Sequence, residues 1–301
     1  EKCHSIKSIH LNYSIINVKT IKMLTTHCKT LECLQLRSIV LTPEEGHDEA
    51  GELLAVGDLL KDKLIHLAIN SHYEFRINED KLTQLLKNLI NLKELRLGAY
   101  IEKFSGSKFI EQFQAKELTE FHAIDKDFDK SVIEKLTKYS KSLIKLSFHP
   151  AQGQTEAVLR QISLNFTNLI HLKLQFTFFS VMNNLVIKSP LSKLTQLKNL
   201  TLDLGQFFDE DVDDGLLFMI KDGIDSLESL ELIRACLSPK SFGNIKYCLP
   251  QLKKLTLHTI DIQCICMIDD LLDKIEKNSC TLCRTKAWKS VAELGQLNQI
   301  Q

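Results

Sequence analysis

Two pairs of cysteines late in the chain are the residues best suited to chemistry. One residue separates Cys264 from Cys266, two separate Cys280 from Cys283, and thirteen lie between the pairs. Four thiolates at such spacing can hold a zinc ion in tetrahedral geometry. The intervening segment 267–277 has a helical pattern and would have to bring both pairs to one point. We therefore expect no metal or other cofactor, with the thiols packed under an end cap, and zinc binding stays the open alternative.

The sequence carries no recognisable catalytic motif. It has no phosphate-binding glycine loop, no nucleophile elbow and no zinc-binding His-Glu helix. Its ten histidines and nine cysteines are scattered along the chain rather than gathered in one motif. We therefore expect a protein that is not an enzyme.

The elements that position these residues come from a phrase repeated ten times: an aliphatic residue, two variable residues, a second aliphatic, one variable residue and a third apolar residue. The copies begin at Ile6, Leu31, Leu64, Leu92, Leu118, Leu143, Leu169, Leu197, Leu227 and Leu252. They start 25 to 33 residues apart, which straddles the period of about 20–29 residues typical of leucine-rich repeats. The spacing indicates a solenoid.

Each repeat is predicted to be a strand, a turn and a helix. The last two apolar residues of the phrase are two apart, so on a strand both point to one side. Between phrases the apolar spacing becomes helical, as at Leu82, Leu85, Leu86 and Leu89. The same spacing recurs at Val132, Ile133, Leu136 and Tyr139, and at Val158, Leu159, Ile162 and Phe166. Stacked units of this kind predict an α/β leucine-rich-repeat solenoid, a right-handed horseshoe of about ten repeats with parallel strands on the concave face and helices on the convex face.

The repeats are predicted to form one domain over residues 1–261, followed by a C-terminal cap and tail over residues 262–301. A polar insertion at residues 42–51 is expected to be a surface excursion. The acidic stretch 209–214 precedes an apolar run and is expected to begin a helix, where carboxylates are favoured by the helix dipole.

Polar side chains that alternate with the strand leucines would line the concave face. They mix both charges with amides and hydroxyls, as protein-recognition surfaces do. In the middle repeats, the predicted partner-binding residues are Arg96, Glu120, His122, Lys145, His149, His171, Lys173 and Gln175. The histidines among them stand at different heights on their strands, so we expect them not to share a metal ion. A second hypothesis is an apolar rim at Phe176, Phe178 and Phe179, of which at least some must be buried.

The charge balance and the cysteines indicate which classes of partner and which cell compartment to expect. Lys and Arg number 38, as do Asp and Glu, so no global field draws the chain to nucleic acid or to an anionic membrane. Nothing approaches the roughly 20 apolar residues that span a bilayer. Nine cysteines without a paired framework favour a reducing compartment, the cytoplasm or the nucleus.

The repeat phrases with their lead-in residues resemble the leucine-rich-repeat half of F-box proteins, the substrate receptors of cullin-RING ubiquitin ligases. In that family a helix often ends in Cys shortly before the next strand, as at Cys3, Cys28 and Cys248. The family's Cys or Asn three residues after the last strand aliphatic is missing, and Cys236 misses that position by one. The resemblance implies an F-box upstream of residue 1 that docks on the ligase adaptor and cullin. It also implies a solenoid that holds a protein substrate for ubiquitin transfer and degradation.

Two functions without ubiquitin remain open. One is a scaffold or sensor domain like those of nucleotide-binding immune receptors or cytoskeletal regulators. The other is a regulator resembling the leucine-rich-repeat activators of small GTPases, although no Arg or Asn outside the strands stands out for that role. The upstream sequence distinguishes these functions.

Overall fold

A computed structural model describes residues 5–13, 15–37, 40–42, 57–70, 76–98, 100–102, 107–128, 130–151, 154–176, 191–203, 224–234, 236–237, 245, 248–258 and 261–262. The C-terminal cysteine pairs, the cap and tail after residue 262, the acidic stretch 209–214 and residues 43–51 of the polar insertion lie outside these ranges. Residue contacts divide the chain into two compact units, residues 1–169 (unit 1) and 170–301 (unit 2).

Unit 1 contains a parallel sheet in which every strand carries one copy of the repeated phrase. Leu34, Leu67, Leu95, Phe121 and Leu146 lie opposite one another on successive strands and are almost fully buried. The strands pair in chain order as β1 (Ser8–Asn12), β3 (Cys33–Arg37), β5 (His66–Asn70), β7 (Glu94–Leu97), β9 (Glu120–Phe128) and β10 (Lys145–Pro150). The pairing confirms the predicted register, because a slip of one residue would turn the leucines outward.

Unit 2 repeats the same build with four strands. Leu172, Leu200, Leu230 and Leu255 lie opposite one another and are buried. The strands are β11 (His171–Gln175), β12 (Asn199–Asp203), β13 (Ser229–Ile233) and β15 (Lys254–His258), all parallel. The ten predicted strands are therefore all present, and the fold is an α/β leucine-rich-repeat solenoid.

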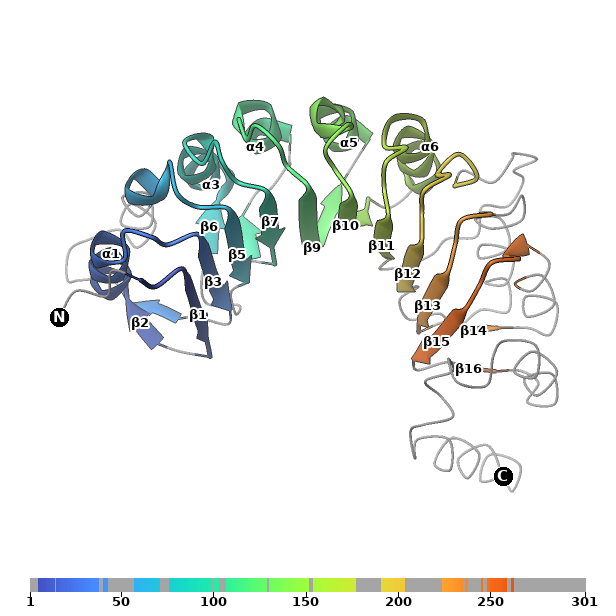
Figure 1. The fold of residues 1–301 in the computed structure, drawn as a ribbon, viewed down its shortest axis with the longest axis horizontal. Coiled ribbons are helices and arrows are strands. Elements are labelled where there is room, and N and C mark those ends of the chain that lie inside the picture. Colours follow the sequence, from blue (N-terminus) through green and yellow to red (C-terminus); the bar gives the residue numbers. More distant parts are fainter. Residues whose placement is uncertain are drawn as a thin grey trace, which may run out of the picture. The chain divides into compact units, whose positions relative to one another are not determined.

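The helices of unit 1 lie along one side of the sheet (Figure 1). They are α1 (Val18–His27), α3 (Glu79–Lys87), α4 (Ser107–Gln112), α5 (Lys130–Leu136) and α6 (Thr155–Asn165), with a 3₁₀ turn, η1 (Thr137–Tyr139), directly after α5. The apolar positions that predicted α3, α5 and α6 are all buried. Tyr139 belongs to the 3₁₀ turn rather than to the α-helix, so the predicted periodicity extends one turn beyond α5.

Short parallel strand pairs follow several of the long strands. They are β2 (Ile15–Asn17) with β4 (Val40–Thr42), β6 (Arg76–Asn78) with β8 (Tyr100–Glu102), and β14 (Cys236–Leu237) with β16 (Asp261–Ile262). Each pair joins two adjacent repeats of one unit, so the stacking of repeats continues beyond the main sheet.

One backbone carbonyl per repeat fixes how the next strand enters the sheet. The carbonyl oxygen of Ile65 accepts hydrogen bonds from the amides of both Lys93 (2.8 Å) and Glu94 (3.0 Å). The carbonyl of Lys93 does the same for Thr119 and Glu120. Because the bonds recur at every junction from β1 to β10, successive strands start at the same height, and side chains at equivalent positions form straight rows across the sheet.

Side chains from one repeat also cap the helix of a neighbouring repeat. The buried carboxylate of Glu79 accepts a hydrogen bond from the backbone amide of Lys108 near the start of α4, at 3.0 Å. The amide oxygen of Gln154 accepts from the backbone amide of Lys130 at the start of α5, also at 3.0 Å. These bonds satisfy helix-end amides that have no partner within their own helix.

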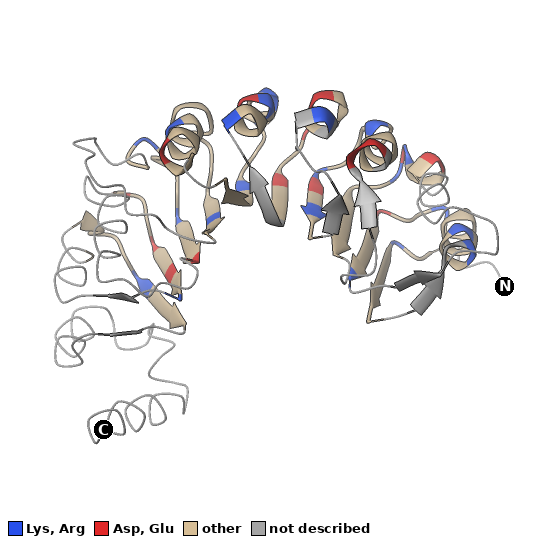
Figure 2. Cartoon of the chain, turned by 180° about the vertical axis from the view of Figure 1, so that it is seen from behind, with Lys and Arg blue, Asp and Glu red and all other residues tan. Residues whose placement is uncertain are grey.

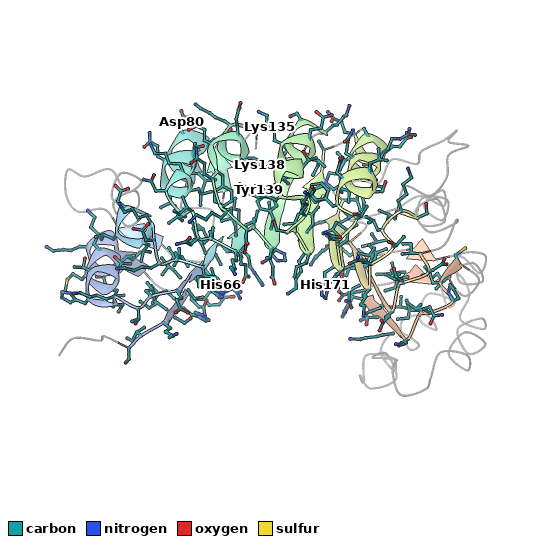
Figure 3. All side chains as sticks on the ribbon, turned by 45° about the horizontal axis from the view of Figure 1, so that its top comes forward. His66, Asp80, Lys135, Lys138, Tyr139 and His171 are labelled. Carbon is teal, nitrogen blue, oxygen red and sulfur yellow. The ribbon has the colours of Figure 1, made fainter. Side chains whose placement is uncertain are left out.

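The C-terminal end of α4 is held by two side chains of the next repeat. The Tyr139 hydroxyl donates to the carbonyl of Phe113 at 2.7 Å, and the Lys138 ammonium donates to the carbonyls of Phe113, at 2.6 Å, and Ile110. In Figure 3, Lys138 and Tyr139 lie nearer the sheet than Asp80 and Lys135, which lie at the outer, helical side. Burial raises the pKa of Tyr139 far above its usual value, so its hydroxyl stays a donor. Burial lowers the pKa of Lys138 against the opposing pull of Glu111.

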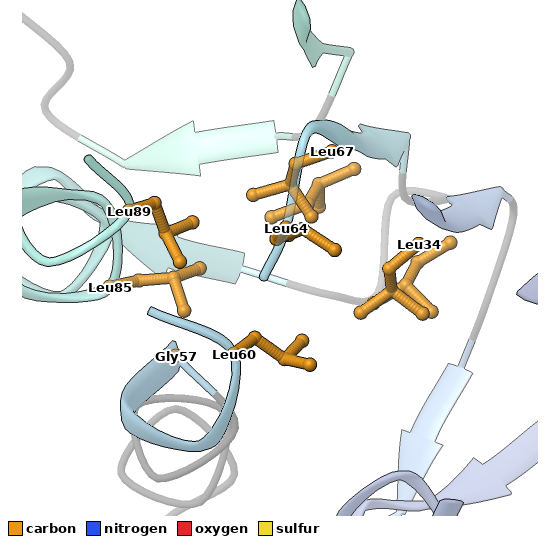
Figure 4. Close-up of a pocket in the computed structure, with 9 residues that line it drawn as sticks. Leu34, Gly57, Leu60, Leu64, Leu67, Leu85 and Leu89 are labelled. Carbon is orange, nitrogen blue, oxygen red and sulfur yellow. The ribbon is translucent and has the colours of Figure 1, made fainter. Parts of the chain in front are cut away.

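The core of unit 1 contains a small apolar cavity (Figure 4). Its volume is about 10 Å³, and its walls include Leu34, Leu64 and Leu67 from two repeats, with Gly57 and Leu85 closing another side. A space of this size holds at most one water molecule, and walls without polar partners keep it dry. The cavity is a packing defect between repeats rather than a ligand site.

None of the described helices has both the length and the apolar character needed to cross a membrane. The longest of them, α6, has 11 residues.

Candidate functional site

Six charged or titratable side chains gather on the face of the unit 1 sheet that points away from the helices, which we call the strand face. They are His66, Glu94, Arg96, Glu120, His122 and Lys145, and we call them the central charge cluster. They come from β5, β7, β9 and β10. The rows set by the strand register bring them together, because His66, Glu94, Glu120 and Lys145 occupy one row while Arg96 and His122 occupy another.

Glu94 is held between two partners. Its Oε2 lies 2.8 Å from His66 Nδ1 on the preceding repeat, and its Oε1 accepts a hydrogen bond from Arg96 Nε. Burial alone would raise the pKa of Glu94, but Arg96 and His66 together outweigh burial and hold that pKa below its ordinary value. Glu94 is therefore ionised at neutral pH.

Glu120 has partners on both neighbouring strands. Lys145 Nζ on β10 lies 2.6 Å from Glu120 Oε1, and Arg96 Nη2 on β7 lies 3.8 Å from Glu120 Oε2. The two carboxylates and the two permanent cations thus form one continuous network over three adjacent strands. A network of this kind restrains side chains that would be mobile if each were alone on the surface.

The side chains of His66, Arg96 and Lys145 are more exposed than the two carboxylates. The side chains of His66 and Arg96 are each 43% exposed and that of Lys145 is 35% exposed, against 15% for Glu94 and 17% for Glu120. Figure 3 shows His66 directed away from the helices. Long Lys and Arg stems carry their charges outward, whereas the shorter Glu side chains stay close to the sheet.

The His122 side chain is 19% exposed, close to the values for the two carboxylates. Its Nε2 is buried without a hydrogen-bond partner and lies 3.6 Å from Glu120 Oε2. Burial and the positive charge of Arg96 lower the pKa of His122, and they outweigh the opposite effect of Glu120. The imidazole is therefore neutral at physiological pH.

Glu94, Glu120 and His122 could together hold a metal ion, because one ligand atom of each lies within 4.8 Å of the others. Carboxylate and imidazole ligands suit zinc and related divalent ions. Both carboxylates are already paired with Arg96 or Lys145, and an incoming cation would have to displace those positive groups. The arrangement therefore suits recognition of polar groups on a partner better than tight metal binding.

One sequence prediction about an exposed side chain was wrong, and one residue of the predicted apolar rim is buried. His149 is buried, at the point where the register of β10 against β9 shifts between Phe148 and His149. Phe176 is also buried, since it continues the inward alternation of Leu172 and Leu174. The other members of the predicted apolar rim, Phe178 and Phe179, lie outside the described residues.

Three further predicted residues, His171, Lys173 and Gln175, lie on β11 of unit 2, with partly exposed side chains on its strand face. This unit has a polar cluster of its own. Glu231 accepts a hydrogen bond from the Thr201 hydroxyl at 2.9 Å, and its other oxygen lies 3.0 Å from His258 Nε2. Of the eight residues predicted to bind a partner, four lie together in the central charge cluster of unit 1: Arg96, Glu120, His122 and Lys145.

His66 and Glu94 belong to the cluster but were not singled out as binding residues from the sequence. The signal that could have found them is the row: once the phrases are aligned, they occupy the same strand position as Glu120 and Lys145. In this row the two acids, Glu94 and Glu120, are neighbours, and two adjacent negative charges predict that basic side chains lie between or beside them.

Comparison with known proteins gives structural likenesses alone. No known protein family matches the sequence, and no curated protein matches it. A chain in the crystal structure of the Rad7 and Elc1 complex from yeast is similar at 17% identity, with a TM-score of 0.48, over 82% of this chain and 75% of that one. An internalin from Listeria monocytogenes is similar at 16% identity, with a TM-score of 0.36, over 89% of this chain and 85% of that one. The leucine-rich-repeat assignment rests on this chain's own phrase and strand pairing.

Proposed function

We propose that this protein is a protein-recognition module and that the strand face of unit 1 binds its partner through the central charge cluster. The observation that carries the proposal is the Glu94, Arg96, Glu120 and Lys145 network, held on three adjacent strands with its cations partly exposed. Rigid strands fix the positions of these side chains, so a partner meets them without a large loss of side-chain entropy.

Charged groups contribute to binding here in the two ways that they do at other polar interfaces. Exposed charges steer encounter and select the partner, and partly desolvated central groups contribute more to affinity. Arg96 has both properties, because its guanidinium is bonded to Glu94 while 43% of its side chain faces solvent. We therefore assign Arg96 as the central contact, with Lys145 and His66 beside it.

We further propose that the module is the substrate receptor of a cullin-RING ubiquitin ligase in the cytoplasm or nucleus. The resemblance to F-box proteins supports this role through the cysteine that ends a helix before the next strand. Cys28 illustrates the feature: its amide donates to the Leu24 carbonyl at the end of α1, its side chain is buried, and Leu31 begins the next phrase. In this role the module supplies position, and the associated ligase subunits supply the chemistry.

Affinity purification of the full-length protein tests both proposals. Arg96→Glu with Lys145→Glu should remove one or more partners that the wild type retains. The control, Lys130→Glu with Lys135→Glu, makes the same charge change on helix α5 and should retain them. Adaptor and cullin subunits should accompany all three forms, because an F-box binds them independently of the strand face.

The outcomes separate the two proposals. Partners retained by the strand-face variant would contradict recognition through the cluster. Absence of adaptor and cullin from every sample, with partners still lost from the strand-face variant, would contradict the ligase role and favour a scaffold or sensor.

A further inference from the structure

We propose that the segment bound by the strand face of unit 1 is an acidic stretch of protein whose carboxylates pair with Arg96 and Lys145. This inference rests on the proposed function, and it adds the chemistry of the partner. It follows from how charge is layered on the sheet rather than from net charge, which is zero for the whole chain.

The layering is set by side-chain length. The side chains of Glu94 and Glu120 are 15% and 17% exposed, whereas those of Arg96 and Lys145 are 43% and 35% exposed. A partner approaching the face therefore meets positive groups first. Figure 2 shows Lys and Arg together with Asp and Glu on these strands.

Hydrogen-bonding capacity points to the same kind of partner. A guanidinium has five N–H donors, and Arg96 uses Nε on Glu94, so donors remain for an incoming carboxylate. A basic partner faces the opposite situation, because reaching Glu94 or Glu120 requires displacement of Arg96 or Lys145 from existing pairs. An acidic partner adds to the network, and a basic one must break it.

The outward positions of β1, β3 and β5 carry no acidic side chain, and on β3 the exposed Arg37 extends the positive surface. Arg96 and Lys145 lie two strand spacings apart and are offset by two residues along the strands, so they are separated by roughly 12 Å, which about three to four residues of extended peptide span. A segment with acidic residues at such intervals fits both cations at once.

Selection from a random 12-residue peptide library displayed on phage, using the purified 301-residue chain as bait, tests this inference. Selected peptides should be enriched in Asp and Glu. A synthetic copy of the best peptide should bind the Arg96→Gln/Lys145→Gln variant on the order of tenfold more weakly than wild type, because two favourable charge pairs are lost. Binding to wild type should also weaken when NaCl is raised from about 50 to about 500 mM.

Three controls keep the test specific. Lys130→Gln/Lys135→Gln removes two charges from α5. It should leave peptide affinity within about twofold of wild type, because salt screens charges that lie far from the binding face. Circular dichroism melting of each variant excludes loss through unfolding, and Arg96→Lys, which keeps the charge, should retain part of the affinity.

Each contrary outcome has its own meaning. Neutral or basic peptides that still depend on Arg96 and Lys145 would overturn the acidic partner and leave recognition by the strand face intact. Peptides whose binding ignores every strand-face substitution would overturn both. A 20-nucleotide single-stranded RNA that binds more tightly than any selected peptide, in an Arg96-dependent manner, would replace the acidic protein with a nucleic acid.

Discussion

Lys145 and Glu120 lie directly opposite each other on β10 and β9, and the Lys145 ammonium is 2.6 Å from the Glu120 carboxylate. The pair joins two repeats whose phrases begin 25 residues apart. Its geometry follows from the register, because each repeat enters the sheet at the same height. A residue's partner on the strand face is thus set by its position in the phrase. Residues at equivalent positions of successive repeats form rows, and the side chains of the candidate site lie along these rows.

The first prediction tests the core with two substitutions in one helix. Leu159 is 0% exposed and Leu164 is 50% exposed, and both lie in α6. Leu159→Ala should lower the free energy of unfolding by about 2–5 kcal/mol, because it leaves a cavity between repeats. Leu164→Ala should change it by less than about 0.5 kcal/mol, as expected of surface substitutions. Urea unfolding measures both, and equal losses would contradict the assigned faces of α6.

The second prediction concerns pH and His122. The unfolded chain binds a proton at this residue below about pH 6.5, whereas the folded chain, in which the pKa is lowered, does so only at more acidic pH. The unfolded state thus gains protons first, and stability is lost as pH falls below about 6.5. His122→Gln should reduce the loss in unfolding free energy between pH 7.5 and 5.5.

A companion substitution checks the sign of the His122 effect. Glu120 opposes the lowering of the His122 pKa, so Glu120→Gln should lower that pKa further and steepen the pH dependence. Chemical denaturation across the same pH range makes the comparison. A shallower dependence in Glu120→Gln than in wild type would contradict the assigned environment of His122.

The third prediction tests the two side chains that hold the end of α4. Tyr139→Phe should cost about 0.5–1.5 kcal/mol of stability, because the Phe113 carbonyl keeps its bond from Lys138. Lys138→Met keeps the apolar stem and should cost a similar amount. The double variant leaves the carbonyl unsatisfied, so its cost should exceed the sum of the single costs. Strict additivity would show that the two side chains act independently.

The fourth prediction uses the tight approach of Gly57 to the next repeat. A Cβ at Gly57 would lie 2.7 Å from Leu85 Cδ1 and 3.1 Å from the Leu85 carbonyl oxygen. Replacing a helical Gly by Ala ordinarily stabilises by about 0.5–1 kcal/mol, but the contact with backbone predicts a loss of about 1–3 kcal/mol for Gly57→Ala. Thermal and urea unfolding give the sign, and a gain in stability would contradict the close packing.

Repetition made the fold predictable from the sequence. Ten phrases in phase define the inward leucines, and each assignment supports its neighbours, so strand existence, direction and register follow together. The central cluster was partly predictable for the same reason, since Arg96, Glu120, His122 and Lys145 share strand rows.

The remaining details depend on local geometry that the phrase does not encode. His149 occupies an outward position by counting, yet it is buried where the register of β10 against β9 shifts. Phe176 follows the phrase as one of three candidates for an apolar rim, and the structure shows that the strand alternation continues through it and buries it. The roles of His66 and Glu94 depend on contacts across strands, which spacing within one repeat does not reveal.

Photo-crosslinking of the full-length protein in cells tests the central claim most directly. Gln35 lies in the row that passes through Ala68 to Arg96, outside the charge cluster, and Lys87 lies at the end of α3. A benzophenone amino acid at Gln35 should form adducts with a partner protein, and those adducts should vanish when Arg96→Glu and Lys145→Glu are added. The same group at Lys87 should form none. Adducts from Lys87 alone, or adducts at Gln35 that persist after both charge reversals, would contradict recognition by the strand face.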